Sequence, residues 1–192
     1  MGREFELKFA ATVQAQQALE AQYGPFRKIA METTYFDTPD KALSAQHITL
    51  RLRRENDAMV CTLKTPLAQG GRGEWECLAD TMDAGLAGLL AAGAPEAPIQ
   101  LAKHGLVIVC GARFTRLAAE LPTADGTAEL ALDHGVLIGG GKELPLCEVE
   151  LEQKTGSDTA TAQLAAQIAQ VYGLQAESKS KFRRAMALAQ EA

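Results

Sequence analysis

The stretch Arg3-Glu4-Phe5-Glu6-Leu7-Lys8-Phe9 alternates charged and apolar residues without interruption. Because successive side chains of a β-strand point to opposite faces, this pattern predicts a strand with Glu4, Glu6 and Lys8 together on one face. The aromatic and aliphatic residues between them form the other face. The strand therefore joins a face suited to a hydrophobic core to a face made only of charges.

The same arrangement recurs along the chain. A single charged face of an antiparallel sheet is most often open to solvent. Here, however, the alternate positions hold Glu, Asp, Arg and Lys in place of Ser, Thr or Gln on at least five strands. If the sheet curls into a barrel, these rows share one interior, where opposite charges balance one another or hold an ion. The rows pair Arg51 with Arg53, Glu74 with Glu76, Glu129 with Asp133, and Glu148 with Glu150 and Glu152, while Lys64 and Arg116 occupy single positions on further strands.

Periodicity predicts an antiparallel α+β fold in a single domain spanning residues 1–192. Asp125-Gly126 between two alternating runs indicates a hairpin, and Gly139-Gly140-Gly141 indicates a turn. The predicted strands are 3–9, 49–54, 59–64, 74–77, 106–110, 114–121, 128–133 and 147–152, and the predicted helices are 12–23, 82–92, 157–172 and 177–189.

Composition narrows the function classes. The net charge of −5 disfavours a general nucleic-acid binder, although it leaves room for a local basic pocket. No run approaches the roughly 20 apolar residues of a membrane span, and the start of the chain lacks the pattern of a signal peptide. The four cysteines show no metal-binding or redox spacing. We therefore expect a cytoplasmic protein with reduced thiols that binds neither membranes nor nucleic acids.

An interior lined by both charge types suits short chains of phosphates. Arginine and lysine bind phosphate oxygens, and paired carboxylates hold Mg²⁺ or Mn²⁺. A purely acidic interior would repel such a ligand, and a purely basic one would lack ligands for the metal. The pattern thus favours a binding site for a phosphate chain together with a divalent cation.

Glu4-Phe5-Glu6-Leu7-Lys8 matches an E-x-E-x-K motif, and eight further motifs follow in order over nearly the full length. Together they resemble the CYTH, or triphosphate tunnel metalloenzyme, superfamily, and most closely its bacterial inorganic triphosphatase branch. These motifs are residues 34–39 (Thr-Tyr-Phe-Asp-Thr-Pro), 50–53 (Leu-Arg-Leu-Arg), 62–65 (Thr-Leu-Lys-Thr), 72–76 (Arg-Gly-Glu-Trp-Glu), 114–116 (Phe-Thr-Arg), 131–133 (Ala-Leu-Asp), 147–152 (Cys-Glu-Val-Glu-Leu-Glu) and 180–181 (Ser-Lys).

The resemblance implies an eight-stranded antiparallel β-barrel, with helices packed outside, whose tunnel holds a small-molecule triphosphate. It implies a hydrolase that uses Mg²⁺ or Mn²⁺, with Glu4, Glu6 and Lys64 in catalysis. The implied phosphate ligands are Lys8, Arg51, Arg53, Lys64, Arg116, Lys181 and Arg184. The implied metal ligands are Glu4, Glu6, Glu148, Glu150, Asp133 and Glu74.

Several functions remain open at this stage. Hydrolysis of inorganic triphosphate leads. Class IV adenylate cyclase, thiamine triphosphatase and a non-catalytic polyphosphate-binding module are the alternatives, and retention of the carboxylates disfavours the last. Relatives in the triphosphatase branch often carry a histidine-rich helical CHAD domain, and these 192 residues contain no such segment.

Overall fold

A computed structural model describes residues 2–67 and 71–190, with the side chains of residues 2–4 excluded. All strand pairs are antiparallel. The strands are β1 (Gly2–Glu4), β2 (Glu6–Ala10), β3 (Arg27–Asp37), β4 (Thr49–Glu55), β5 (Ala58–Pro66), β6 (Arg72–Leu78), β7 (Val107–Pro122), β8 (Thr127–Gly139), β9 (Lys142–Thr155) and β10 (Gln175–Ala176). The helices are α1 (Val13–Tyr23), α2 (Ala42–Ala45), α3 (Met82–Ala91), α4 (Glu96–Lys103), α5 (Asp158–Tyr172) and α6 (Lys181–Gln190).

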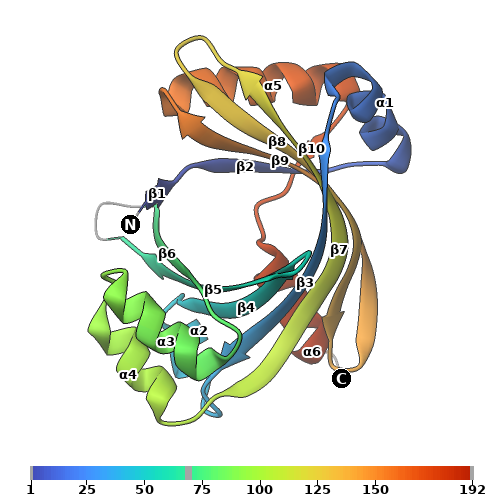
Figure 1. The fold of residues 1–192 in the computed structure, drawn as a ribbon. Coiled ribbons are helices and arrows are strands. Elements are labelled where there is room, and N and C mark those ends of the chain that lie inside the picture. Colours follow the sequence, from blue (N-terminus) through green and yellow to red (C-terminus); the bar gives the residue numbers. More distant parts are fainter. Residues whose placement is uncertain (1, 68–70, 191–192) are drawn as a thin grey trace.

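The first ten residues close the sheet into a barrel. The strand order is β1-β6-β5-β4-β3-β7-β8-β9-β2-β10, so β1 lies at one edge and β2 lies near the other. Only Phe5 separates these two strands, and the stretch 2–10 therefore joins the edge at β6 to the edge at β9. If β1 and β2 are counted as one strand and the two-residue β10 is left out, the described residues form a ring of eight strands. Figure 1 shows this ring. The predicted eight-stranded antiparallel barrel is confirmed.

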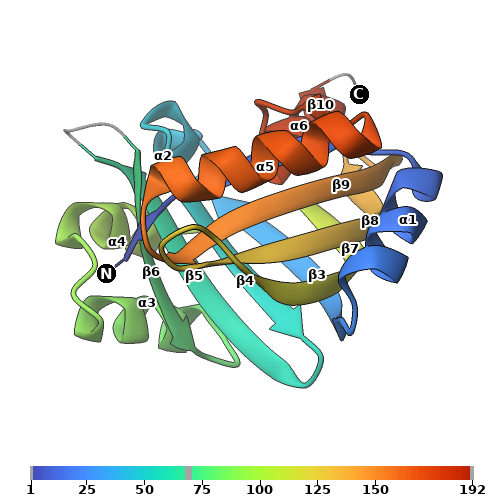
Figure 2. The same cartoon turned by 90° about the horizontal axis from the view of Figure 1, so that it is seen from above.

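Helices cover the outer face in two groups (Figures 1 and 2). Under α3 and α4, a core forms around Leu63, Trp75 and Leu89, so Trp75 points away from the barrel interior, as its place between Glu74 and Glu76 predicts. Under α1 and α5, a second core includes Leu130 and Val149. Each core takes the apolar face of strands whose alternate residues point inward, which places the charged rows inside the barrel.

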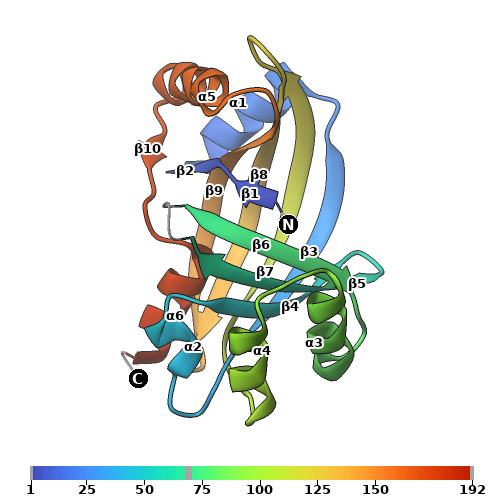
Figure 3. The same cartoon turned by 90° about the vertical axis from the view of Figure 1, so that its left-hand side faces the viewer.

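Helix α6 differs from the others because it packs against the inner face. Its residues Phe182 and Ala185 share a hydrophobic cluster with Met31, Leu137 and other inward side chains of β3, β7, β8 and β9. The approach is close: a Cβ added to Gly139 would lie 2.1 Å from the Ala185 carbonyl oxygen, so β8 needs a glycine there. Helix α6 therefore covers part of the interior, although the sequence predicts helices on the outside only (Figure 3).

Some element boundaries differ from the prediction. The predicted strands do not include β3, and β7 is one strand where two are predicted. No helix is predicted around Pro95 and Pro98, although α4 begins there. Proline is compatible with the first turn of a helix because the N–H groups of that turn have no partner within the helix. The last helix begins at Lys181, four residues later than predicted, after Ser180 accepts a hydrogen bond from the Arg183 N–H.

The motif at residues 34–39 has a structural role. Asp37 is fully buried, and its carboxylate accepts backbone N–H groups of Thr38, Leu43 and Ser44 at 2.8 to 3.2 Å. These bonds fold the chain from β3 into α2, and they satisfy a charge that would otherwise be costly to bury. Among the described residues, no helix has the length and apolar character needed to cross a bilayer.

Candidate active site

The barrel interior holds a cavity of about 500 Å³. Among the described residues, ten basic side chains and seven glutamates line it, an excess of three positive charges. The basic residues are Lys8, Arg27, Arg51, Arg53, Lys64, Arg72, Arg116, Lys154, Lys181 and Arg183, and the glutamates are Glu6, Glu55, Glu74, Glu76, Glu129, Glu150 and Glu152.

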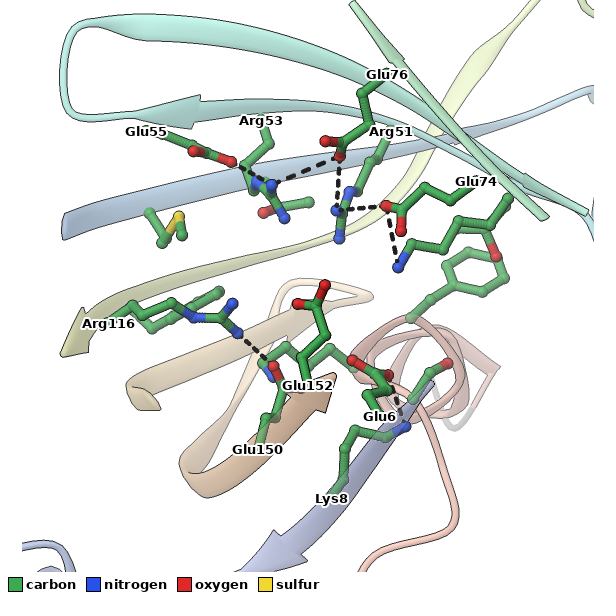
Figure 4. Close-up of a pocket in the computed structure, with 18 of the residues that line it drawn as sticks. Glu6, Lys8, Arg51, Arg53, Glu55, Glu74, Glu76, Arg116, Glu150 and Glu152 are labelled. Atoms are coloured by element: carbon green, nitrogen blue, oxygen red, sulfur yellow. Dashed lines mark hydrogen bonds and ion pairs between the residues drawn. The ribbon is translucent and has the colours of Figure 1, made fainter. Parts of the chain in front are cut away.

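One wall of the cavity, formed by β4, β5 and β6, is a ladder of alternating charges (Figure 4). The Arg51 guanidinium lies 3.7 Å from Glu74 and 3.6 Å from Glu76, and the Lys64 ammonium lies 3.2 Å from Glu74. Arg53 pairs with Glu55 and lies 3.8 Å from Glu76. The separations of Arg51 from Glu74 and Glu76, and of Arg53 from Glu76, are longer than direct hydrogen bonds.

The charges of this wall shift the pKa values of its members. Burial alone would raise the pKa of Glu76, but Arg51 and a 2.8 Å hydrogen bond from Thr62 outweigh burial and lower that pKa. Burial, reinforced by the charge of Arg51, lowers the pKa of Arg53. Cations as close together as Arg51 and Arg53 repel each other and attract a polyanion that enters the cavity.

The facing wall, formed by β2, β8 and β9, carries a row of carboxylates. Glu152 lies directly opposite Glu6 on β2 and directly opposite Glu129 on β8. Lys8 contacts Glu6 at 3.0 Å, and Lys154 lies 3.0 Å from Glu152 and 3.8 Å from Glu129. Like charges in directly opposed positions repel each other, so this row favours an additional cation.

A third group lies beside the cavity and is buried. Asp133, Glu148 and Glu150 offer oxygen atoms that all lie within 4.8 Å of one another. The Lys181 ammonium lies 2.8 Å from Asp133 and 2.7 Å from Glu150, and it also pairs with Glu148. Arg116 donates two 2.7 Å hydrogen bonds to Asp133 and a further bond to Glu150, and Arg184 of α6 pairs with Glu148. We call these six residues the α6 socket.

The α6 socket has strongly shifted pKa values. Burial would raise the pKa of Glu150, but Lys181 and Arg116 outweigh it and hold that pKa well below its usual range. Burial raises the pKa of Glu148 to about 7 despite its cationic partners, because Glu150 competes for the same ammonium. Burial would lower the pKa of Lys181, but the three carboxylates raise it.

The structure brings most predicted site residues to the cavity. The predicted residues that line it are Glu6, Lys8, Arg51, Arg53, Lys64, Glu74, Arg116, Glu150 and Lys181. Asp133, Glu148 and Arg184 are not among the lining residues, and they form the part of the α6 socket that lies away from the cavity. The Glu4 side chain lies outside the described residues, although its backbone pairs with Arg72.

Several lining residues are absent from the predicted ligand set. Glu152 and Lys154 share the inward face of β9 with Glu150, so alternation alone could have found them. Arg27 on β3, whose pattern the sequence analysis omits, also lines the cavity. Tyr35, which is not among the predicted ligands, is buried, lines the cavity and packs on Phe182 with ring centroids 5.1 Å apart.

The chain is similar to known proteins over most of its length. It is 29% identical over 82% of its length to the inorganic triphosphatase of Haemophilus influenzae, but spans only 47% of that protein. It is 33% identical to the Bacillus subtilis protein YjbK, provisionally named a triphosphatase, over 70% of this chain and 72% of that one. Thus the chain spans about half the length of the first of these relatives.

Solved structures share the fold. A Bacillus halodurans protein provisionally described as an adenylate cyclase superposes with a TM-score of 0.68 at 23% identity, covering 94% of this chain and 96% of that one. A Hippeastrum protein, described as having a dominant triphosphatase activity, superposes with a TM-score of 0.63 at 19% identity, covering 98% and 95%. Across residues 2–186 the sequence matches the profile of the CYTH domain, and the chain therefore belongs to the CYTH domain family.

Proposed function

We propose that this chain hydrolyses inorganic triphosphate, or a closely related triphosphate compound, in the barrel cavity with the help of Mg²⁺ or Mn²⁺. The observation that carries the proposal is the cavity with its two unlike walls: a ladder with Arg51 and Arg53 faces a row of carboxylates with Glu6 and Glu152 (Figure 4), and Lys64 joins the ladder through Glu74. The names of the two relatives support the same reaction class.

The cationic ladder binds the phosphate chain. Arg51 and Lys64 both contact Glu74, and Arg51 and Arg53 both lie near Glu76. Phosphate oxygens compete with these glutamates for the same donors, and guanidinium groups can hold them through two parallel hydrogen bonds. A row of cations along adjacent strands matches a ligand whose charges are spaced along a chain.

The carboxylate row fits a divalent cation. Glu6 and Glu152 are directly opposed, line the cavity and offer carboxylate oxygens, the donors that Mg²⁺ and Mn²⁺ prefer. Their side chains are 25% and 32% exposed, so water can complete the ligand sphere. We place Glu6 and Glu152 as the main ligands, with Glu129 nearby. When bound, the cation neutralises charge on the phosphates and lowers the pKa of a bound water.

The chain's own residues then orient and stabilise the reacting groups. An oxygen of the attacking water forms a bond to the terminal phosphorus, the bridging P–O bond breaks, and orthophosphate and diphosphate result. One of the water's two protons passes to a carboxylate of the row, for which Glu6 is our choice, and the other stays on the orthophosphate. Lys64 and Arg51 stabilise charge on the transferred group and on the departing diphosphate.

Phosphate release tests the proposal. Inorganic triphosphate, ATP and thiamine triphosphate are each incubated with the chain plus Mg²⁺, Mn²⁺ or EDTA. We expect release from inorganic triphosphate that depends on the metal. Cyclic AMP from ATP would instead indicate the adenylate cyclase reaction, and binding of triphosphate without turnover would indicate a binding module.

A pair of matched variants links the activity to the cavity. Glu6→Gln removes one carboxylate of the row, whereas Glu143→Gln removes an exposed carboxylate that pairs with Arg113 on the barrel surface. We expect activity to fall in the first variant and to persist in the second. Equal activity in both would contradict the placement of the reaction in the cavity.

A further inference from the structure

The α6 socket has the oxygen atoms of a metal site but a different occupant. Its three carboxylates converge within 4.8 Å, and the ammonium group of Lys181 lies among them. An ammonium has three N–H donors, and each of the three carboxylates accepts one contact from it. The donors of Lys181 are thus satisfied by the same oxygen atoms that a metal would need.

Charge within the socket is already balanced. Asp133, Glu148 and Glu150 carry three negative charges when ionised, and Lys181, Arg116 and Arg184 carry three positive ones. Asp133 and Glu148 are fully buried, and Glu150 and Lys181 are 7% and 9% exposed. A divalent cation added to this neutral, buried group would displace the ammonium or leave two charges uncompensated, and both outcomes are unfavourable.

The surrounding backbone is built to hold this arrangement. Asp133 and Glu148 are directly opposed on β8 and β9, and their backbone carbonyls both accept hydrogen bonds from the Gln16 side chain of α1 at 2.9 Å. Helix α1 thus fixes the two strands from outside while α6 supplies cations from inside. Close packing of α6 on Gly139 and the ring contact between Phe182 and Tyr35 hold Lys181 over the socket.

Three members of the socket, Arg116, Glu150 and Lys181, also line the cavity. Arg116 lines the cavity, and its guanidinium is oriented by Asp133 and Glu150. Whatever fixes these two carboxylates also fixes the direction in which Arg116 presents its remaining donors. Docking of α6 is therefore connected to the cavity by hydrogen bonds.

We propose that Lys181 is a tethered cation that seats α6 on Asp133, Glu148 and Glu150, so that this cluster docks a helix and positions Arg116 while the divalent cation binds elsewhere. Lys181 is then a positioning residue. This inference rests on the proposed function for its statement about the catalytic metal. The docking of α6 rests on the geometry of the socket alone.

Titration with Mn²⁺ in the absence of triphosphate, followed by electron paramagnetic resonance on the full chain, separates the two carboxylate groups. We expect Glu152→Gln to weaken Mn²⁺ binding by about 10-fold or more, since it loses a direct ligand, and Glu148→Gln to change it by less than about 3-fold. Loss of Mn²⁺ binding in Glu148→Gln equal to that in Glu152→Gln would overturn the proposal.

Lys181→Met provides an independent test. The test remains informative even if the wild-type chain binds metal only together with substrate. Without the tethered ammonium, the three carboxylates become available, and we expect the variant to bind one Mn²⁺ more than the wild type. Unchanged stoichiometry in a folded variant would overturn the proposal.

Hydrogen exchange gives a second readout for the same variant. We expect the α6 amides of Lys181→Met to exchange faster than in the wild type, and added Mn²⁺ to slow them again by occupying the socket. Unchanged exchange would overturn the docking role. Should the variant be unfolded without metal, refolding on addition of Mn²⁺ supports the proposal and failure to refold overturns it. None of these measurements uses triphosphate hydrolysis, so a failure of the proposed function would be seen separately.

Discussion

The carboxylate row of the cavity and the α6 socket use the same residue types on the same strand, yet their surroundings give them different chemistry. Glu152 is 32% exposed and has one ammonium, Lys154, at 3.0 Å. Glu148, four residues earlier, is fully buried and is held by two cations from α6. A partly hydrated carboxylate with one exposed partner can exchange that partner for a ligand. A buried carboxylate in a charge-balanced cluster cannot do so without a large cost in free energy, because a buried charge would lose its partner. Burial and charge balance therefore distinguish the carboxylates that we propose as cation ligands from those of the α6 socket.

The largest effect is expected from breaking the α6 socket. Asp133→Ala removes a buried carboxylate that two cations share, and it leaves Arg116 and Lys181 short of a partner. Such a loss lowers the free energy of unfolding by about 3–5 kcal/mol. Urea denaturation measures it. The matched control, Glu143→Ala, breaks the exposed pair with Arg113 and should change the same quantity by less than about 1 kcal/mol. Similar values for the two variants would remove the distinction between the regions.

Removing a cation from the cavity should affect turnover more than stability. Lys64→Ala is expected to reduce the rate of triphosphate hydrolysis by about 10²-fold, the loss typical of one preorganised electrostatic contact. Steady-state phosphate release gives the rate, and urea denaturation on the same sample should show a native-like free energy of unfolding. Arg113→Ala, which removes an exposed cation, serves as the control and should retain its rate. Comparable rates for the two variants would argue against the site assignment.

A smaller effect is expected from crowding α6. In Gly139→Ala the new methyl group would lie 2.1 Å from the Ala185 carbonyl oxygen, so the helix must shift. Overpacking of this kind lowers the free energy of unfolding by about 1–3 kcal/mol. Urea denaturation measures the loss, and an unchanged free energy of unfolding in Gly139→Ala would contradict the close packing of α6.

The last effect concerns pH. Burial raises the pKa of Glu148 to about 7, above the value of about 4.3 expected for an unfolded chain. Between these two values the folded protein binds a proton that the unfolded chain lacks, so the contribution of Glu148 to stability decreases as pH rises through this window and then levels off above pH 7. Glu148→Gln should remove this decrease. Urea midpoints from pH 5 to 8 test it, and parallel curves for the two proteins would contradict the assignment.

Alternation of charged and apolar residues was sufficient to predict most of the strands and the side chains that share a face, and the resemblance to the CYTH superfamily implied the barrel that turns those charges inward. The prediction failed where that contrast is weak. The inward residues of β3 include Ile29, Met31 and Tyr35, and its outward residues include Ala30 and Phe36, so the strand has no charged row to reveal it. Helix α4 is missing from the prediction for a different reason. Proline usually interrupts a helix, but here Pro95 and Pro98 lie at the start of one.

The division of the carboxylates between cavity and socket could not be read from the sequence. Glu148, Glu150 and Glu152 share one face of β9 and look equivalent in the pattern. What separates them is Lys181 and Arg184, which lie about 30 residues further along the chain and reach the strand only after α6 has packed inside the barrel. This long-range contact depends on tertiary packing, which local periodicity does not encode.

The most direct test of this division is a crystal structure of the full chain with Mn²⁺ and a non-hydrolysable triphosphate analogue, using anomalous scattering to locate the metal. The account predicts an anomalous peak between Glu6, Glu152 and the phosphates, with Lys181 still bound to Asp133, Glu148 and Glu150. A peak among Asp133, Glu148 and Glu150, with Lys181 displaced, would contradict it.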